Sequence, residues 1–420
     1  MTGEDNPTHH TVVPLGDGYY EETVVEYVDS GRSRKVYALI LVLLFLLLLG
    51  AGYAVTRLAR PAGAPTASTL PPGISWIRSF YSFGPTPKEI LQTPTATAIG
   101  PDGTVWTLAN KQYIVGFSPG GDVRHVIAPK LGMGVGEVIS LEGIAIDSDG
   151  SVYVTDFGKN MVDVFSPSGT FLRSWGVELP QVIDVRRGIV AVAASNGVGL
   201  FDTGGKLIAK WGSRGTREDQ VDLPHGILIG SDNTIYVSDT QNRRIKAYDR
   251  SGRLLWMFAD PNRTGQNLMS TQTTVPVVGG VSQSLILPTG LTQDASGRLI
   301  VLDTFSFQIV VMDPAQKGRI VARYGEQGVQ DGQFVYPTGV SYDSARDMLA
   351  IADTTNNRVQ LIRIPGTGGS LVRGALASLT DTPIWLCFAP FLLLLGALIL
   401  WMWRRRRERS GTTQEEPAVH

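Results

Sequence analysis

The sequence predicts an all-β fold, a six-bladed β-propeller with four-stranded antiparallel blades. One observation is repetition, because a unit of roughly 40 residues recurs about six times, each copy with four short apolar stretches separated by turn residues. That pattern is typical of a propeller blade. A second is the abundance of glycine (48) and proline (24) among 420 residues, which tight turns between short strands require. A third is position, since the repeats lie between two long apolar runs.

The first two strands of each copy align across the repeats. Between them stands a turn signal such as Ser148-Asp149-Gly150, and the third and fourth strands are joined by signals such as Pro167-Ser168-Gly169. These residue types favour hairpins. The predicted spans of the two strands are Ile99–Leu108, Ile146–Asp156, Val185–Ala194, Ile229–Asp239, Gln293–Asp303 and Tyr342–Asp353.

The sixth copy stops after its third strand, Val359–Ile364, and lacks a fourth. Upstream of the first copy, Ile74–Phe80 resembles the outer strand Phe171–Trp175. We therefore predict that Ile74–Phe80 is an N-terminal strand that closes the last blade. Closure satisfies the backbone groups that an open ring would expose, and it brings both linkers to one blade.

Both apolar runs predict transmembrane helices. Residues 36–55 and 383–403 carry no charge over 20 and 21 residues, enough to cross a hydrocarbon core of about 30 Å. Arg404–Arg407 and Arg409 follow the second run, and a weaker excess of positive charge precedes the first. Such clusters stay in the cytoplasm. We therefore predict a two-pass protein of the cell membrane with both termini cytoplasmic and an extracytoplasmic propeller. A cleaved signal peptide is the alternative for the first run, but its leader is too long and too acidic.

The predicted domain order follows from these segments. It is a cytoplasmic tail without regular structure (1–35), a transmembrane helix (36–55), a linker (56–72), the propeller (73–365), a linker (366–382), a second transmembrane helix (383–403) and a basic cytoplasmic tail (404–420). The net charge of −1 gives no general attraction to nucleic acid. The single cysteine, Cys387, excludes a disulfide within one chain and a cysteine-based metal site.

Two turns between second and third strands share one motif. Asp239-Thr240-Gln241-Asn242-Arg243-Arg244 and Asp353-Thr354-Thr355-Asn356-Asn357-Arg358 both read Asp-x-x-Asn-x-Arg. With these turns, residues 74–364 resemble the NHL-repeat family of six-bladed propellers. The motif could be a ligand cluster, but its recurrence favours a structural role in which Asp accepts turn N–H groups and Arg pairs between blades. The resemblance implies the fold; this fold carries many functions.

Candidate ligand-contacting residues lie where each innermost strand begins, at one mouth of the central channel. The residue just before the one that opens this strand should point toward the mouth. The third copy aligns less well, because Val182 replaces the Gly or Ala that opens the others. The resulting ring is Thr95, Glu142, Gln181, His225, Thr289 and Thr338. Two long connections, Ala128–Leu141 and Asp260–Leu287, should lie on the same face, and long loops on a rigid scaffold often bind ligands.

The sequence thus favours a binding module for another protein, a glycan or an envelope component, in a surface complex or a sensor, and no cofactor is expected. The alternative is a surface-tethered enzyme, because similar six-bladed propellers include metal-dependent lactonases and histidine-dependent lyases. Glu142 and His225, helped by Gln181, could hold a divalent ion. A transition-metal site usually needs three protein ligands, and no Ser/His/Asp arrangement is legible. Catalysis is therefore the less favoured reading.

Overall fold

The computed structural model describes residues 9–14, 20–25, 41, 44, 45, 48, 70–259 and 277–368. The chain divides into two units, Met1–Thr66 and Ala67–His420. The predicted span 383–403 and the basic tail 404–420 lie outside the described residues, as do most of the span 36–55 and most of both linkers. In the part of the chain that is described, no helix is long and apolar enough to cross a membrane.

The first unit contains a hairpin in the tail that was predicted to lack regular structure. Strand β1 (His9–Pro14) pairs antiparallel with β2 (Tyr20–Val25), with His9 opposite Val25. The prediction is wrong here because each strand contains a β-branched run, Thr11-Val12-Val13 and Thr23-Val24-Val25, and such residues favour extended pairing. Further along this unit, within the first apolar run, four described residues are helical and exposed: Leu41, Leu44, Phe45 and Leu48.

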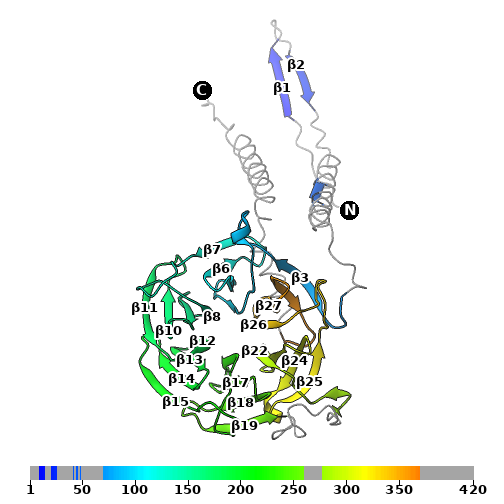
Figure 1. The fold of residues 1–420 in the computed structure, drawn as a ribbon. Coiled ribbons are helices and arrows are strands. Elements are labelled where there is room, and N and C mark those ends of the chain that lie inside the picture. The colour runs from blue at the N-terminus through cyan, green and yellow to red at the C-terminus, as the bar shows by residue number, and fades with distance from the viewer. Residues whose placement is uncertain are drawn as a thin grey trace. The chain divides into compact units, whose positions relative to one another are not determined.

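In the second unit the described residues form six four-stranded antiparallel sheets, arranged as the blades of a ring (Figure 1). Blade 1 consists of β4 (Thr97–Ile99), β5 (Val105–Ala109), β6 (Tyr113–Phe117) and β7 (Val123–Ile127). Blade 2 consists of β8 (Leu141–Ile146), β9 (Val152–Asp156), β10 (Met161–Phe165) and β11 (Phe171–Gly176). Blade 3 consists of β12 (Pro180–Arg186), β13 (Ile189–Ala194), β14 (Gly197–Asp202) and β15 (Leu207–Trp211).

The remaining blades repeat this order. Blade 4 consists of β16 (Gly226–Ile229), β17 (Ile235–Asp239), β18 (Arg244–Tyr248) and β19 (Leu254–Ala259). Blade 5 consists of β22 (Pro288–Gln293), β23 (Leu299–Asp303), β24 (Gln308–Asp313) and β25 (Arg319–Tyr324). Blade 6 consists of β26 (Pro337–Asp343), β27 (Met348–Asp353), β28 (Arg358–Arg363) and β3 (Ser75–Phe80). Short elements lie between blades: β20 (Val277–Val278), β21 (Val281–Ser282) and the 3₁₀ helices η2 (Pro87–Glu89) and η4 (Pro314–Gln316). All six predicted spans fall on observed hairpins.

The ring is closed by the N-terminal strand, as predicted. Strand β3 pairs antiparallel with β28, and Phe80 lies opposite Val359. Gly73, just before β3, has φ of +78°, and a Cβ there would lie 2.6 Å from the Tyr324 ring and 3.7 Å from Pro365. Glycine is therefore required where the chain enters the ring beside the outer strand of blade 5.

The hydrophobic core lies between blades rather than along the channel. Each of six buried clusters joins two neighbouring blades. The cluster across the closure contains Phe80 and Leu361 of blade 6 with Val105 and Phe117 of blade 1. Each such side chain contributes about 1.5–3 kcal/mol when fully buried, so blade contacts around the whole circle stabilise the ring.

Candidate functional site

The two faces of the propeller differ because the innermost strands of all blades run in the same direction, from one face to the other. We call the face where inner strands begin the entry face. It also carries the connections from each outer strand to the next blade, such as residues 212–225, and the turns between second and third strands, such as residues 240–243. The opposite face, the exit face, carries the turns between first and second strands, such as residues 230–234.

The predicted polar ring lies on the entry face, but only half of it meets in one cavity. A small cavity of about 60 Å³ is lined by Thr95, His225 and Thr338 together with the beginnings of the inner strands. Glu142, Gln181 and Thr289 do not line it. The role of the six residues in ligand binding stays a prediction, and their contacts show what each does within the fold.

The threonine hydroxyls of the polar ring link neighbouring blades through hydrogen bonds. The Thr338 hydroxyl donates to the Thr95 carbonyl at 2.8 Å and lies 2.6 Å from the Thr354 hydroxyl. The Thr95 hydroxyl in turn donates to the Glu142 carbonyl at 3.2 Å. The Thr289 hydroxyl lies 2.7 Å from that of Thr304. These hydroxyls satisfy inner-strand carbonyls that no sheet ladder reaches, which buried backbone requires.

Glu142 and Gln181 are turned toward structural partners. The Glu142 carboxylate accepts hydrogen bonds from the Lys111 ammonium at 2.9 Å and from the Ser140 hydroxyl at 3.2 Å. The Lys111–Glu142 ion pair is partly exposed. The Gln181 amide, which is buried, donates to the Ser195 hydroxyl at 3.0 Å. A polar residue at this position is therefore used differently in each blade, according to the neighbour it meets.

Among the ring residues, His225 has a buried side-chain atom without a hydrogen bond to the described part of the chain. Its backbone N–H donates to the Thr240 hydroxyl at 3.0 Å, whereas its buried Nδ1 makes no hydrogen bond with the described part of the chain. Burial lowers the pKa of the imidazole, and the Glu142 carboxylate opposes that shift. Neutral imidazole is thus favoured near pH 7. Among the described residues, no group of three or more His, Cys, Asp or Glu side chains could hold a metal ion.

The larger cavity of the channel, about 540 Å³, opens on the exit face and was not predicted. Two charged residues of β12 line it and bind the neighbouring blade. Asp184 accepts the Ile229 N–H at 2.7 Å, and Arg186 donates to the Ile229 carbonyl at 3.1 Å. Burial raises the pKa of Asp184, and the bond from Ile229 opposes this. The sequence signal that could have indicated this cavity is a charged residue within an apolar inner strand, Asp184 in Ile-Asp-Val.

Three connections on the entry face share one compact fold, which we call bridge loops: residues 131–138, 214–221 and 327–334. In each, the first and last residues form a parallel β-bridge. The last residue of each loop, Val138, Val221 or Phe334, is fully buried. The predicted long connection Ala128–Leu141 is therefore one copy of a recurrent structure. Its length follows from that structure and does not by itself mark a binding loop.

The first bridge loop differs from the others in its exposed side chains. Leu131, Met133 and Val135 are 63%, 70% and 87% exposed. The second long connection, Asp260–Leu287, is described from residue 277 onward, where β20 and β21 form a hairpin and Val277 is 61% exposed. Its residues 260–276 lie outside the described chain.

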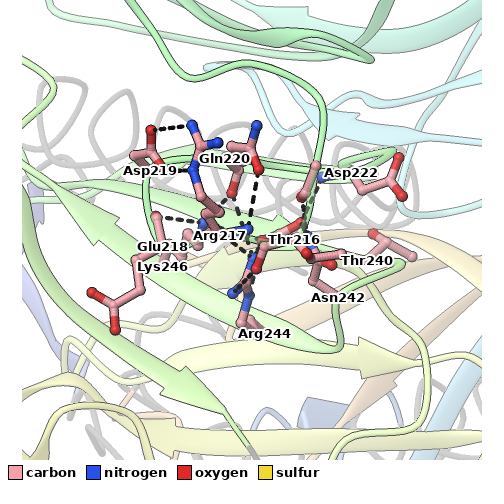
Figure 2. A network of polar contacts seen from close by, with 12 residues as sticks. Thr216, Arg217, Glu218, Asp219, Gln220, Asp222, Thr240, Asn242, Arg244 and Lys246 are labelled. Atoms are coloured by element: carbon pink, nitrogen blue, oxygen red, sulfur yellow. Dashed lines mark hydrogen bonds and ion pairs between the residues drawn. The ribbon is translucent and has the colours of Figure 1, made fainter. Parts of the chain in front are cut away.

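The Asp-x-x-Asn-x-Arg motif of blade 4 holds the second bridge loop in place (Figure 2). Buried Asp239 accepts from Arg244 at 2.7 Å, from Asn242 at 2.8 Å and from the Asp222 N–H at 2.8 Å. Arg244 also donates to loop carbonyls, including that of Thr216 at 2.9 Å. The structural reading of the motif is therefore confirmed. Arg244 pairs with an aspartate of its own blade, and its contacts toward blade 3 are with backbone carbonyls. In blade 6 the equivalent Arg358 also lies 3.4 Å from Asp331 in the connection from blade 5, so the predicted pairing between blades holds there and not in blade 4.

Lys246 completes this network, and sequence reasoning missed it. Its ammonium has no exposed surface, lies 3.2 Å from Asp239, and donates to the carbonyls of Glu218 (2.9 Å) and Gln220. Burial lowers its pKa, and the carboxylate of Asp239 opposes that shift. A lysine alternating with apolar residues in Arg-Ile-Lys-Ala-Tyr was the available signal.

The other blades vary the same arrangement. In blade 6, Gln360 takes the place of Lys246 and donates to Asp353 at 3.0 Å. In blade 5, where the arginine of the motif is replaced by Gln308, the cation near Asp303 is Arg323 of β25 at 3.5 Å. A buried carboxylate at the end of the second strand thus attracts a cation from different positions, as its desolvation requires.

Comparison with known proteins finds relatives that match parts of this chain. No family profile matches the chain. Protein brain tumor of Drosophila melanogaster is 27% identical over 143 residues, covering 28% of this chain and 14% of that protein. NHL repeat-containing protein 3 of Homo sapiens is 23% identical over 252 residues, covering 54% of this chain and 65% of that protein. The matches thus span less than two thirds of either relative.

Solved structures that match the chain include two of virginiamycin B lyase from Staphylococcus aureus. A catalytically inactive variant with quinupristin is 16% identical, covers 64% of this chain and 80% of that one, and has a TM-score of 0.45. The selenomethionine form is 13% identical, covers 69% and 99%, and has a TM-score of 0.46. No activity follows from similarity at this level. The NHL-repeat relatives, the motif turns of blades 4 and 6 and the closed ring together identify the chain as an NHL-type six-bladed β-propeller.

Proposed function

We propose that this propeller is a binding module that recognises another protein through its entry face. The observation that carries the proposal is the exposed apolar surface of the first bridge loop, Leu131, Met133 and Val135. The equivalent positions of the second bridge loop are Arg214, Thr216 and Glu218, as the matching β-bridges show.

The three bridge loops have equivalent parallel bridges and each ends in a buried apolar residue, so the fold does not require apolar side chains at the exposed positions. The third loop has Gln327, Val329 and Asp331 there, and of these only Val329 is a large apolar residue. Exposed apolar groups on loops of a rigid scaffold are the usual mark of a protein interface.

The test is a pull-down from detergent-solubilised membranes with the intact chain and a triple variant, Leu131→Ser, Met133→Ser and Val135→Ser. We expect the partner to be lost with this variant. The matched control changes Arg214, Thr216 and Glu218 to serine and should retain it. Retention by the first variant, or equal loss in both, would contradict the proposal. A variant lacking Asn262–Ser284 asks the same question of the second long connection.

We also propose that the chain is anchored in the cell membrane with the propeller outside. The apolar runs at 36–55 and 383–403 and the arginines after the second support this. In a Cys387→Ser background, Ser168→Cys on an exposed turn should react with a membrane-impermeant maleimide on intact cells. Ser410→Cys in the basic tail should react only after permeabilisation. The reverse labelling pattern would place the propeller inside.

A further inference from the structure

A hollow of about 370 Å³ lies between blades 2 and 3, and the proposed entry-face function does not use it. Its walls include the aromatic rings of Trp175 and Phe201 and the side chain of Leu207. Glycines form much of the rest, among them Gly197 and Gly199 of β14. The volume lies within the range of about 300–1,000 Å³ that is typical of ligand pockets. We call this space the blade 3 hollow.

The hollow lies at the position in blade 3 that is equivalent to the position of the ion network in blade 4. In blade 4, Asp239 lies opposite Arg244 across the turn between the second and third strands. In blade 3 the same register pairs Ala194 with Gly197. Two residues further along the third strand, Lys246 of blade 4 corresponds to Gly199. Small residues thus stand in blade 3 at all three positions that are charged in blade 4, which are Asp239, Arg244 and Lys246.

The bridge loop that this network holds is missing beside blade 3. Only residues 177–179 connect β11 to β12, whereas residues 212–225 connect β15 to β16. A Cβ built on Gly325, after the outer strand of blade 5, would lie 2.9 Å from Phe334 of its bridge loop. A Cβ on the equivalent Gly176 would meet nothing within 4 Å. The space that a bridge loop fills elsewhere is therefore open beside blade 3.

The remaining walls still resemble those that receive a loop. Trp175 and Phe201 lie 6.0 Å apart between ring centroids, as Trp211 and Tyr248 lie 5.4 Å apart in the next gap. Lys210 lines the hollow and is exposed, and its ammonium makes no hydrogen bond or ion pair with the described residues. An ammonium there can donate to peptide carbonyls, which is what Lys246 does in blade 4.

We propose that the blade 3 hollow is a docking pocket for a peptide segment of a partner protein, anchored by one valine, leucine or phenylalanine. The choice of occupant follows from the chain itself, because three other gaps between blades receive such a segment in cis. Their anchors are Val138, Val221 and Phe334, all fully buried. This second site is independent of the first bridge loop and does not rest on the entry-face proposal.

The probe is a fluorescent synthetic peptide with the sequence of residues 326–335 of this chain, which carries the anchor Phe334. It is titrated into the full chain in detergent and followed by anisotropy. We expect saturable binding to the intact chain. The same peptide with Phe334→Ser should bind at least about tenfold more weakly, as expected for loss of an anchor in a pocket.

Ala194→Phe should fill the hollow and weaken binding of the unaltered peptide by at least about tenfold. Ala194 lines the hollow at the register position that Asp239 occupies in blade 4. Ala194→Ser is the matched control and should bind nearly as the intact chain does. If Ala194→Phe does not fold, Lys210→Glu serves instead and should weaken binding by charge reversal. Absence of peptide binding, or binding that is unaffected by the Phe334→Ser peptide and by the filling variant, would overturn the proposal. The entry-face serine variant should leave it unchanged.

Discussion

Asp163 on β10 shows how a single residue can oppose folding in this ring. Its side chain has no exposed surface, and its one ion pair, with Lys159 at 3.6 Å, is beyond hydrogen-bond range. Burial raises the pKa of this carboxyl to about 6, and Lys159 opposes the shift. Because the folded-state pKa exceeds the ordinary 3.8, the folded state binds the proton more tightly. The cost of burying the charge is therefore full above pH of about 6 and disappears as the pH falls below about 4.

Asp163→Asn is accordingly expected to raise the free energy of unfolding at pH 7.5 by about 1–3 kcal/mol, with the gain vanishing near pH 4. Denaturant titration of the full chain in detergent at the two pH values measures this. Asp156→Asn is the contrasting variant, because Asp156 accepts N–H groups of Ile139 at 2.8 Å and Ser140 at 2.9 Å. That change should destabilise by about 1–3 kcal/mol. If Asp163→Asn instead lowers the free energy of unfolding at pH 7.5, the prediction is wrong, and Lys159 compensates fully for the cost of burying the carboxylate.

At the scale of elements, the bridge loop and the strand pair β17–β18 form one unit through buried charge. Asp239→Ala should destabilise the protein by about 3–5 kcal/mol, because it leaves Arg244 and Lys246 buried without a counter-charge. Lys246→Gln is the matched control, since blade 6 has Gln360 at this position, where it donates to the Gln333 carbonyl at 2.8 Å. It should cost much less. Equal losses in denaturant midpoint for both variants would argue against a dominant role of the charge.

The comparison of blades also shows what the sequence could predict about these elements. The Asp-x-x-Asn-x-Arg turns identified the strand ends, because a motif that recurs at equivalent positions indicates a common backbone need. The partners of the motif were not predictable. Arg244 binds carbonyls of Thr216 and Arg217, and backbone atoms have no sequence signature. Arg323 serves blade 5 from a different strand, so the compensation is visible only once β24 and β25 are paired.

For the whole molecule, ring closure was predictable and the use of the channel mouth was not. Closure followed from a missing fourth strand and a spare copy of it at Ile74–Phe80. The six residues of the polar ring lie at or just before the beginnings of the inner strands on one face, and the contacts of their side chains are set by neighbours distant in sequence. Thr338 binds the Thr95 carbonyl across the closure, whereas Glu142, at the equivalent position, binds Lys111. Such contacts depend on which blades meet, and a repeat pattern read one copy at a time does not contain that information.

The closure leads to a prediction for the ring as a unit. Replacing Gly73–Tyr81 by a glycine-serine segment of equal length should remove β3, expose the edge of β28 and uncover the cluster that joins Phe80 to Val105 and Leu361. Because all six clusters join neighbouring blades, loss of one contact opens the circle, and the single cooperative unfolding transition should become broad and shift to lower temperature. Calorimetry of the full chain in detergent measures the transition.

The matched control replaces Trp76–Phe80 by Phe171–Trp175 of the blade 2 outer strand, a segment of the same length in the same register. If an outer strand is what the sixth blade needs, this sequence should restore much of the cooperativity, since its Phe171, Arg173 and Trp175 take the register positions of Trp76, Arg78 and Phe80. An unchanged transition with the glycine-serine segment would mean that pairing of β3 with β28 contributes little, and the ring would then be held by its other five blade contacts. Loss of cooperativity with both replacements would instead assign the closure to the particular side chains of β3, above all to Phe80 stacked on Phe117 at 4.6 Å.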